Sequence, residues 1–366
     1  KKRERIDWYG DVVKMAHMEY ELEQERDFWL CAELRKGLNS EISKDFSAFE
    51  NLEESDLEDA RDSSDGTWRE FWSRSGIFLE DKELEAIWYR NLYFFNCAAR
   101  SGVNCPGLFA NWSFNDIGTA WHGDYHMNYN TQQPFWATYS SNHLELNEPY
   151  VELIEFISDV ARIWAKDYYE MRGAFYPHSA YPVDMTMNPY PVPTWGWEIF
   201  ETPWSVQGLW WHYLYAPDEK FLEERAFPLI REATEFIIDY MTRPEAHGPQ
   251  WGDDKYHVFP TVPPELYGLR PGFRFNSDCL VDLTLIKFLF NAYLESVDIL
   301  GLQGQEKKNV KDVRRILDNY PEYPTAVSDK YGKVFVSVNG ESTETVYNVP
   351  NNLMTAFPGE DLSLIH

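Results

Sequence analysis

The segment HGDYHMNYN, residues 122–130, concentrates polar and aromatic side chains in nine positions. Asn128 and Asn130 lie two positions apart, and an asparagine amide offers a donor and an acceptor without carrying a charge. Such amides are suited to orienting a water molecule that a carboxylate deprotonates. The alternative is that the pair caps a helix beginning just after it, because asparagine is a favourable N-cap residue.

His122, Asp124 and His126 occupy alternating positions of the same segment. In extended backbone this spacing places three side chains on one side, where we expect them to bind sugar hydroxyls. Zinc is an alternative, because His and Asp are both zinc ligands. However, the chain has no HExxH motif and no third histidine at helical spacing nearby, so zinc is disfavoured. Ordinary loop hydrogen bonding is the remaining alternative.

Aromatic residues make up 17% of the chain and include 15 tryptophans. Indole and phenol rings stack on the flat C–H faces of sugars, although they also serve as core filler. The segment TWGWEIFETPW, residues 194–204, gathers three of the tryptophans. We expect Trp195, Trp197 and Trp204 to contact substrate, with Trp195 and Trp197 in a loop that lines a cleft.

Charge and composition narrow the class of partner. The 366 residues carry a formal net charge of −27, which repels nucleic acids and anionic membrane surfaces. No apolar run reaches the roughly 20 residues of a membrane-spanning helix. With 44% hydrophobic residues the chain can bury a sizeable core, and its four cysteines form no CxxC pair. We therefore expect a globular protein that acts on an uncharged ligand, with no nucleic-acid or membrane partner; the oligomeric state stays open.

Apolar residues at helical spacing predict several helices, and polar, aromatic loops separate them. The helices are expected over residues 12–38, 83–100, 148–171, 218–240 and 278–301. The long loops are expected over 101–127, 172–204 and 244–275, and a hairpin over 331–339. The acidic residues 47–66 are expected to form a solvated linker or loop. We divide the chain into an N-terminal helix and acidic linker, 1–66, and a main domain, 67–366.

Successive helices joined by such loops favour an all-α fold, a helical toroid with its loops gathered at one end. A complete (α/α)6 barrel needs twelve helices, and fewer are expected before His366. The first residues, KKRERIDWYG, lack both a Met and the apolar stretch of a signal peptide. We therefore expect the chain to be part of a longer protein, with the C-terminal part of the barrel missing.

Residues 121–150, WHGDYHMNYNTQQPFWATYSSNHLELNEPY, resemble the signature of glycoside hydrolase family 95. This is a family of α-L-fucosidases and α-L-galactosidases with an (α/α)6-barrel catalytic domain. The likeness extends over roughly 68–366 and includes FPTVPPELYG (259–268) and NVPNNLMTAFPGEDLSL (348–364). It implies an inverting exo-glycosidase that removes a terminal α-linked L-fucose or L-galactose, without a cofactor or metal. A secreted or periplasmic location follows only from that substrate class.

The resemblance also assigns roles to residues. Glu265 matches the general acid, and apolar neighbours could give it the raised pKa that an acid needs at neutral pH. Asn128 and Asn130 match the pair that holds the water, and His178 matches a family histidine. The family's base precedes a histidine-rich segment. Here that segment reads YNVPNN and Glu344 lies nearest the position of the base, with Glu341 or a residue after the chain's end as alternatives. An exposed loop glutamate is the alternative for each carboxylate, and the changed segment leaves the sugar open.

Two other functions fit the same architecture. Helical toroids also include polysaccharide lyases and sugar phosphorylases, but the signature segment lacks the basic residue typical of lyases. No basic or glycine-rich phosphate site lies beside Glu344 in the sequence. The second possibility is a glycan-binding or scaffold protein that lost its base when the histidine-rich segment changed.

Overall fold

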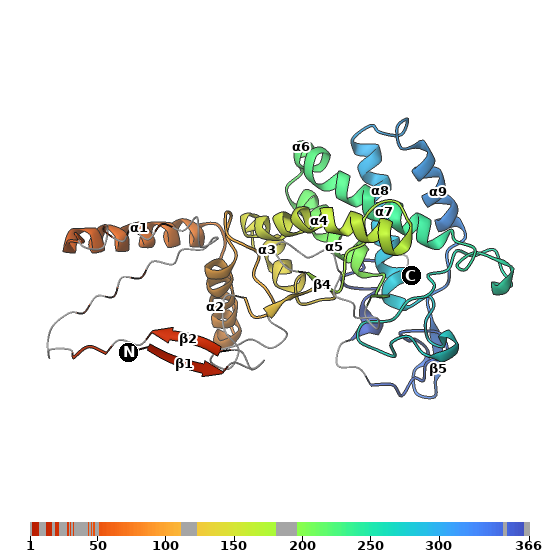
Figure 1. The fold of residues 1–366 in the computed structure, drawn as a ribbon, viewed down its shortest axis with the longest axis horizontal. Helices are drawn as coiled ribbons and strands as arrows, with labels where there is room; N and C mark the ends of the chain where they lie inside the picture. Colours follow the sequence, from red (N-terminus) through yellow and green to blue (C-terminus); the bar gives the residue numbers. More distant parts are fainter. Residues whose placement is uncertain are drawn as a thin grey trace. The chain divides into compact units, whose positions relative to one another are not determined.

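The computed structural model describes residues 2–6, 12–16, 51–110, 123–180, 196–346 and 350–361, with isolated positions between 19 and 47. These residues form two compact units, one built from those up to Glu85 and a larger one from those beginning at Ala86. Helices dominate both the chain and Figure 1, so the predicted all-α class is confirmed.

The α-helices are α1 (Glu54–Ser73), α2 (Lys82–Ala98), α3 (Trp136–Ser140), α4 (Glu148–Tyr169), α5 (Glu201–Tyr215), α6 (Glu219–Phe221), α7 (Phe227–Met241), α8 (Leu280–Ile299) and α9 (Lys307–Asp318). Within the described residues, the strands form three antiparallel pairs: β1 (Lys2–Ile6) with β2 (Val12–Ala16), β3 (Tyr125–His126) with β4 (Ser179–Ala180), and β5 (Thr325–Ser328) with β6 (Gly332–Phe335).

The smaller unit corrects two predictions. A helix was expected over residues 12–38, but Val12–Ala16 is the strand β2, paired residue by residue with β1. The adjacent β-branched residues Val12 and Val13 favour a strand, and the partner strand supplies the backbone hydrogen bonds. Most of the remaining residues of that predicted helix lie outside the described ranges.

The acidic segment 47–66 was expected to be a linker or loop, yet α1 begins within it. The Asp56 carboxylate accepts the backbone N–H of Glu53 at 2.8 Å, closing the first turn. Acidic side chains there are stabilised by the positive end of the helix dipole. Helix α1 also continues through residues 66 and 67, so the predicted domain division does not fall at the end of an element.

The remaining predicted helices are confirmed with small shifts at their ends. α2, α4 and α8 reproduce the ranges 83–100, 148–171 and 278–301 to within about two residues. The range 218–240 contains α6, a π turn over Leu222–Ala226, and α7. Asp218 is the N-cap of α6, and its carboxylate accepts the N–H of Lys220 at 2.9 Å. The amphipathic helix α9 was not predicted.

Two helices form the centre of the larger unit. α5 is buried along most of its length and packs against α4, α7 and α8, as Figure 1 shows. α8 is also apolar on nearly all sides, as expected of a helix surrounded by others. The predicted hairpin is also present, as β5 and β6, beginning at Thr325 rather than at residue 331. This packed centre fixes the first residue of α5, Glu201, which belongs to the candidate site.

Two glycines have similar backbone conformations but different surroundings. Gly173 (φ +74°) lies against α7, where an added Cβ would sit 2.0 Å from the carbonyl oxygen of Glu232. Gly301 (φ +66°) follows α8, with no heavy atom within 4 Å of its Cβ position.

Gly301→Ala is therefore expected to lower the free energy of unfolding by about 1–2 kcal/mol through left-handed backbone strain alone. Gly173→Ala adds a backbone clash and is expected to cost about 2–5 kcal/mol. Urea denaturation of both variants measures the difference. Equal losses would contradict the close approach of residue 173 to α7.

Candidate active site

The signature segment forms a tight turn anchored by a short strand pair. Tyr125 and His126 pair with Ala180 and Ser179, and the N–H of Met127 donates to the carbonyl of His178 at 2.8 Å. The next helical turn, Gln133–Phe135, has Gln132 at its N-cap position and no side-chain cap. The asparagines therefore do not act as its caps, so the helix-capping alternative is wrong.

Asp124 and His126 share one side of this turn, as their alternating positions predicted. Asp124 is 5% exposed, and its Oδ1 lies 2.6 Å from Nδ1 of His126. The His126 ring packs edge-on against His178 at a centroid separation of 5.2 Å. Asp124 and His126 are thus a close pair beside His178. The third predicted member, His122, lies outside the described residues.

The loop carrying Glu265 is held from two sides. Trp197 accepts the N–H of Val262 at 3.2 Å through its backbone carbonyl. The buried Asn276 donates to the carbonyls of Thr261 and Gly268. Between these anchors Glu265 itself adopts a left-handed conformation, with φ +52°. The backbone of the loop is therefore fixed at the residue whose carboxylate is of interest.

Asn128 and Glu265, 137 residues apart in sequence, meet in the folded chain. The side-chain Nδ2 of Asn128 donates to Oε1 of Glu265 at 3.2 Å. Asn128 is buried, whereas Glu265 and Asn130 are exposed. The carboxylate is thus held at one oxygen by an amide and is open to an approaching molecule, whereas burial among apolar neighbours was expected.

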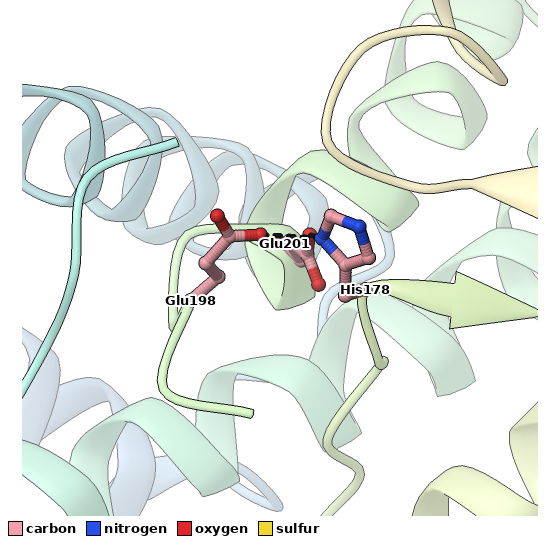
Figure 2. A group of neighbouring side chains, drawn as sticks. All are labelled: His178, Glu198 and Glu201. Carbon is pink, nitrogen blue, oxygen red and sulfur yellow. Dashed lines mark hydrogen bonds and ion pairs between the residues drawn. The ribbon is translucent and has the colours of Figure 1, made fainter. Parts of the chain in front are cut away.

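Figure 2 shows a group of three neighbouring side chains, His178 with the buried Glu198 and Glu201. Nδ1 of His178 lies 2.7 Å from Oε2 of Glu198 and 3.1 Å from Oε1 of Glu201, and both glutamates are fully buried. The other oxygen of Glu198 accepts the backbone N–H of Glu265 at 3.0 Å. The group therefore reaches the Glu265 loop directly.

The pKa values of two of these groups, His178 and Glu201, are raised. Burial by itself lowers the pKa of His178, but the charge of Glu201 and the hydrogen bonds to both glutamates outweigh it and raise that pKa to about 11. Burial, and then the charge of Glu198, raise the pKa of Glu201 well above its ordinary value. His178 thus carries a proton at neutral pH and lies between two buried carboxyl groups.

A metal ion is the other occupant that this group could take. Among the described residues, the possible ligand atoms of His178, Glu198 and Glu201 all lie within 4.8 Å of one another. One imidazole and two carboxylates are a donor set that suits zinc. The same atoms are already joined by hydrogen bonds, however, and bound protons account for the arrangement without an ion.

Glu341 and Glu344 occupy different surroundings. Glu341 is buried, and its two oxygens accept the hydroxyl of Tyr267 at 2.5 Å and the N–H of Ser337 at 2.7 Å. Glu344 is exposed and bonds to its neighbours, accepting from Thr343 and donating its N–H to Ser342. Because Tyr267 belongs to the same loop as Glu265, Glu341 is linked to that loop.

The aromatic residues divide between core and surface. Trp204 is 1% exposed and belongs to a core cluster with Phe200 and Leu285, so it is placed in the interior rather than at an open cleft. Trp197 is partly buried against the main core. Tyr129, next to Asn128, is 42% exposed. Trp195 lies outside the described residues.

Comparison with known proteins joins these observations. Residues 36–333, about four fifths of the chain, match the model of the glycosyl hydrolase family 95 catalytic domain. The chain belongs to glycosyl hydrolase family 95. This matched range includes Asn128, Asn130 and Glu265 but ends before Glu341 and Glu344. Membership agrees with the (α/α)6 toroid expected from the sequence, to which the helices of the larger unit contribute.

Two family relatives are similar over parts of their length. The chain is 22% identical over 287 residues to Alpha-L-fucosidase 2 of Arabidopsis thaliana, covering 77% of the chain and 32% of that protein. It is 24% identical over 194 residues to Probable alpha-fucosidase A of Aspergillus niger, covering 48% and 23%. The match with each relative thus covers at most about a third of that relative's length.

Several site residues of this family 95 chain were not predicted. Glu198 and Glu201 lie three positions apart in the aromatic segment GWEIFE, flanked by apolar residues that suggest core. Carboxylates in such surroundings are the signal that could have identified them, because buried acids are costly and concentrate at functional sites. Tyr267 and Tyr129 carried no comparable signal.

Among the described residues, no helix is both long and apolar enough to cross a membrane.

The protonation of two histidines gives a direct test of the site's electrostatics. His178 is expected to be an imidazolium at pH 7 and His212 a neutral imidazole, because burial lowers the pKa of His212 and carboxylates raise that of His178. The folded chain retains the His178 proton where the unfolded chain releases it. The resulting stabilisation is therefore complete below about pH 6.5 and is lost as the pH rises toward 11.

Carbon-13 NMR of labelled histidine rings between pH 5 and 9 measures both states. The resonances are assigned by their absence in the variants His178→Gln and His212→Gln. We expect the His178 signals to stay at imidazolium positions throughout. Titration of His178 near pH 6.5 would contradict the ion pairs drawn in Figure 2.

Proposed function

We propose that this protein is an inverting exo-glycosidase that hydrolyses a terminal α-L-fucosidic bond, or the closely related α-L-galactosidic bond, of an oligosaccharide. Membership of family 95 and the names of both relatives, which are α-fucosidases, support this substrate class. The observation that carries the proposal is the contact of Asn128 with Glu265, which joins a water-orienting amide to a solvent-accessible carboxyl group.

The proposed reaction is a single displacement. The Glu265 carboxyl protonates the glycosidic oxygen as its bond to the anomeric carbon breaks. A water molecule oriented by Asn128 and Asn130 attacks the opposite face, and a second carboxylate accepts its proton. Inversion requires about 6.5–9.5 Å between the two carboxyl groups, so that the water fits between base and sugar. Donation from Asn128 to Oε1 leaves Oε2 of Glu265 to carry the transferred proton.

We assign the base to Glu344 because a base must reach the attacking water, and its carboxylate is exposed. Glu341 is less suited to this task, since it is buried and both its oxygens already accept hydrogen bonds. Its proposed role is to hold Tyr267, and through it the loop that carries the acid.

Two predicted residues, His126 and His178, and the exposed Tyr129 are proposed to bind the sugar. His126 and His178 lie beside the asparagine turn, and Tyr129 offers an exposed ring next to Asn128. The proposed chemistry needs no cofactor, because carboxyl groups and hydrogen bonds suffice to stabilise an oxocarbenium-like transition state. A secreted or periplasmic location stays a proposal that rests on the substrate class.

A substrate panel tests the proposal. The p-nitrophenyl glycosides of α-L-fucose, α-L-galactose, α-D-galactose and β-L-arabinose should be assayed together with a set of natural fucosylated oligosaccharides. We expect turnover of the α-L-fucoside or α-L-galactoside and release of the free sugar. Unsaturated products would indicate a lyase, and turnover that requires phosphate would indicate a phosphorylase. Calorimetric binding without hydrolysis over days would indicate a glycan-binding protein.

A further inference from the structure

Glu265 is not held by a helix or a strand, so its orientation depends on the contacts of its loop. Its backbone is left-handed, a conformation that costs about 1–2 kcal/mol for a residue other than glycine. Neighbouring contacts must therefore stabilise it. The backbone of Glu265 is held by the hydrogen bond from its N–H to Oε1 of Glu198, at 3.0 Å.

Glu198 joins that bond to the opposite side of the site. Its second oxygen is hydrogen-bonded to Nδ1 of His178 at 2.7 Å. The backbone carbonyl of His178 accepts a hydrogen bond from the N–H of Met127 at 2.8 Å. Met127 precedes Asn128, whose amide returns to the carboxylate of Glu265. The contacts thus form a closed ring through four separate segments of the chain.

Full burial of Glu198 restrains this ring. Glu198 is 0% exposed, and a buried carboxylate retains its hydrogen-bond partners because losing one leaves a desolvated charge unpaired. Glu201 bonds to the same nitrogen of His178, but the described hydrogen bond to the N–H of Glu265 comes from Glu198. The two buried glutamates are therefore a natural matched pair.

We propose that Glu198 is a positioning residue for the acid, holding the backbone of Glu265 so that its carboxyl group meets both Asn128 and the glycosidic oxygen. The inference rests on the proposed role of Glu265 and adds to it. A misplaced acid still donates protons, but less effectively, because proton transfer depends on alignment with the leaving oxygen. The defect must therefore grow as the leaving group becomes poorer.

The experiment compares Glu198→Ala with Glu201→Ala. Alanine removes the acceptor for the N–H of Glu265, whereas glutamine would keep an amide oxygen in its place. For each variant, kcat/KM is measured on a natural fucosylated oligosaccharide, which needs strong protonation of the leaving group, and on p-nitrophenyl α-L-fucoside, which needs little. The ratio of the first value to the second does not depend on the fraction of folded enzyme. We expect Glu198→Ala to lower this ratio at least about tenfold and Glu201→Ala to change it less than about twofold.

The outcomes separate this inference from the proposed function. An active wild type with an unchanged ratio in Glu198→Ala overturns the positioning role, even if both rates fall. An equal drop in Glu201→Ala overturns it too, because the buried cluster as a whole would then be responsible. An inactive wild type overturns the proposed function and this inference with it. If Glu198→Ala does not fold, Glu198→Asp, which withdraws the acceptor by one methylene group, is measured in its place, with the same drop expected.

Discussion

Glu265→Gln is expected to lower kcat/KM on a natural fucosylated oligosaccharide by about a hundredfold to ten-thousandfold. The amide keeps the shape of the side chain but has no proton to give to the departing sugar oxygen. The fluoride ion of α-L-fucosyl fluoride departs without such help, so the rate of hydrolysis of this substrate is expected to fall less than about tenfold. Steady-state kinetics on both substrates measure the contrast.

Glu245 supplies the matched control for this variant. It is an exposed glutamate in the loop that follows α7. Glu245→Gln is expected to leave both rates at their wild-type values. If Glu265→Gln hydrolyses the oligosaccharide at a near-normal rate, Glu265 has no part in the mechanism.

Glu344→Ala is expected to lower hydrolysis of oligosaccharide and aryl substrates alike, by about a hundredfold to ten-thousandfold. Both substrates need an activated water, so the leaving group does not protect either. Azide needs no deprotonation and should restore turnover of p-nitrophenyl α-L-fucoside. It bonds to the anomeric carbon as the bond to the phenol oxygen breaks, giving the β-L-fucosyl azide.

Glu341→Gln distinguishes the two candidate bases. In this variant the contact between residue 341 and Tyr267 is weakened, so activity is expected to fall. Azide is not expected to restore it, because the base would still be present. Mass spectrometry of the products detects the azide adduct in either variant. Rescue of Glu341→Gln, with wild-type rates in Glu344→Ala, would transfer the role of base from Glu344 to Glu341.

Local features of the fold were predictable where one residue dominates the local energy. Asp218 as an N-cap and Gly301 after α8 follow from short-range hydrogen bonding and from backbone freedom. The segments 12–16 and 54–66 were not predictable in this way. The spacing of residues 12–16 suggested a helix, but pairing with β1 makes them a strand. The acidic composition of residues 54–66 suggested a loop, but capping begins a helix there.

The candidate site shows a similar division. The types and spacing of Asn128 and Asn130 indicated a site, and family likeness indicated Glu265, but no periodicity encodes the contact between residues 137 positions apart. Glu198 was missed because apolar neighbours made its segment resemble core. Trp204 was expected at the cleft, yet an aromatic side chain has the same composition signal whether it is buried or exposed.

The stereochemistry of hydrolysis tests the central claim most directly. Proton NMR should be used to follow the anomeric signals of the sugar in the first minutes of reaction with a natural α-L-fucosyl oligosaccharide, before mutarotation. The account predicts that β-L-fucose appears first and that the α anomer follows slowly. Initial release of α-L-fucose, or no release at all, would contradict a single displacement in which Glu265 is the acid and water attacks the opposite face of the sugar.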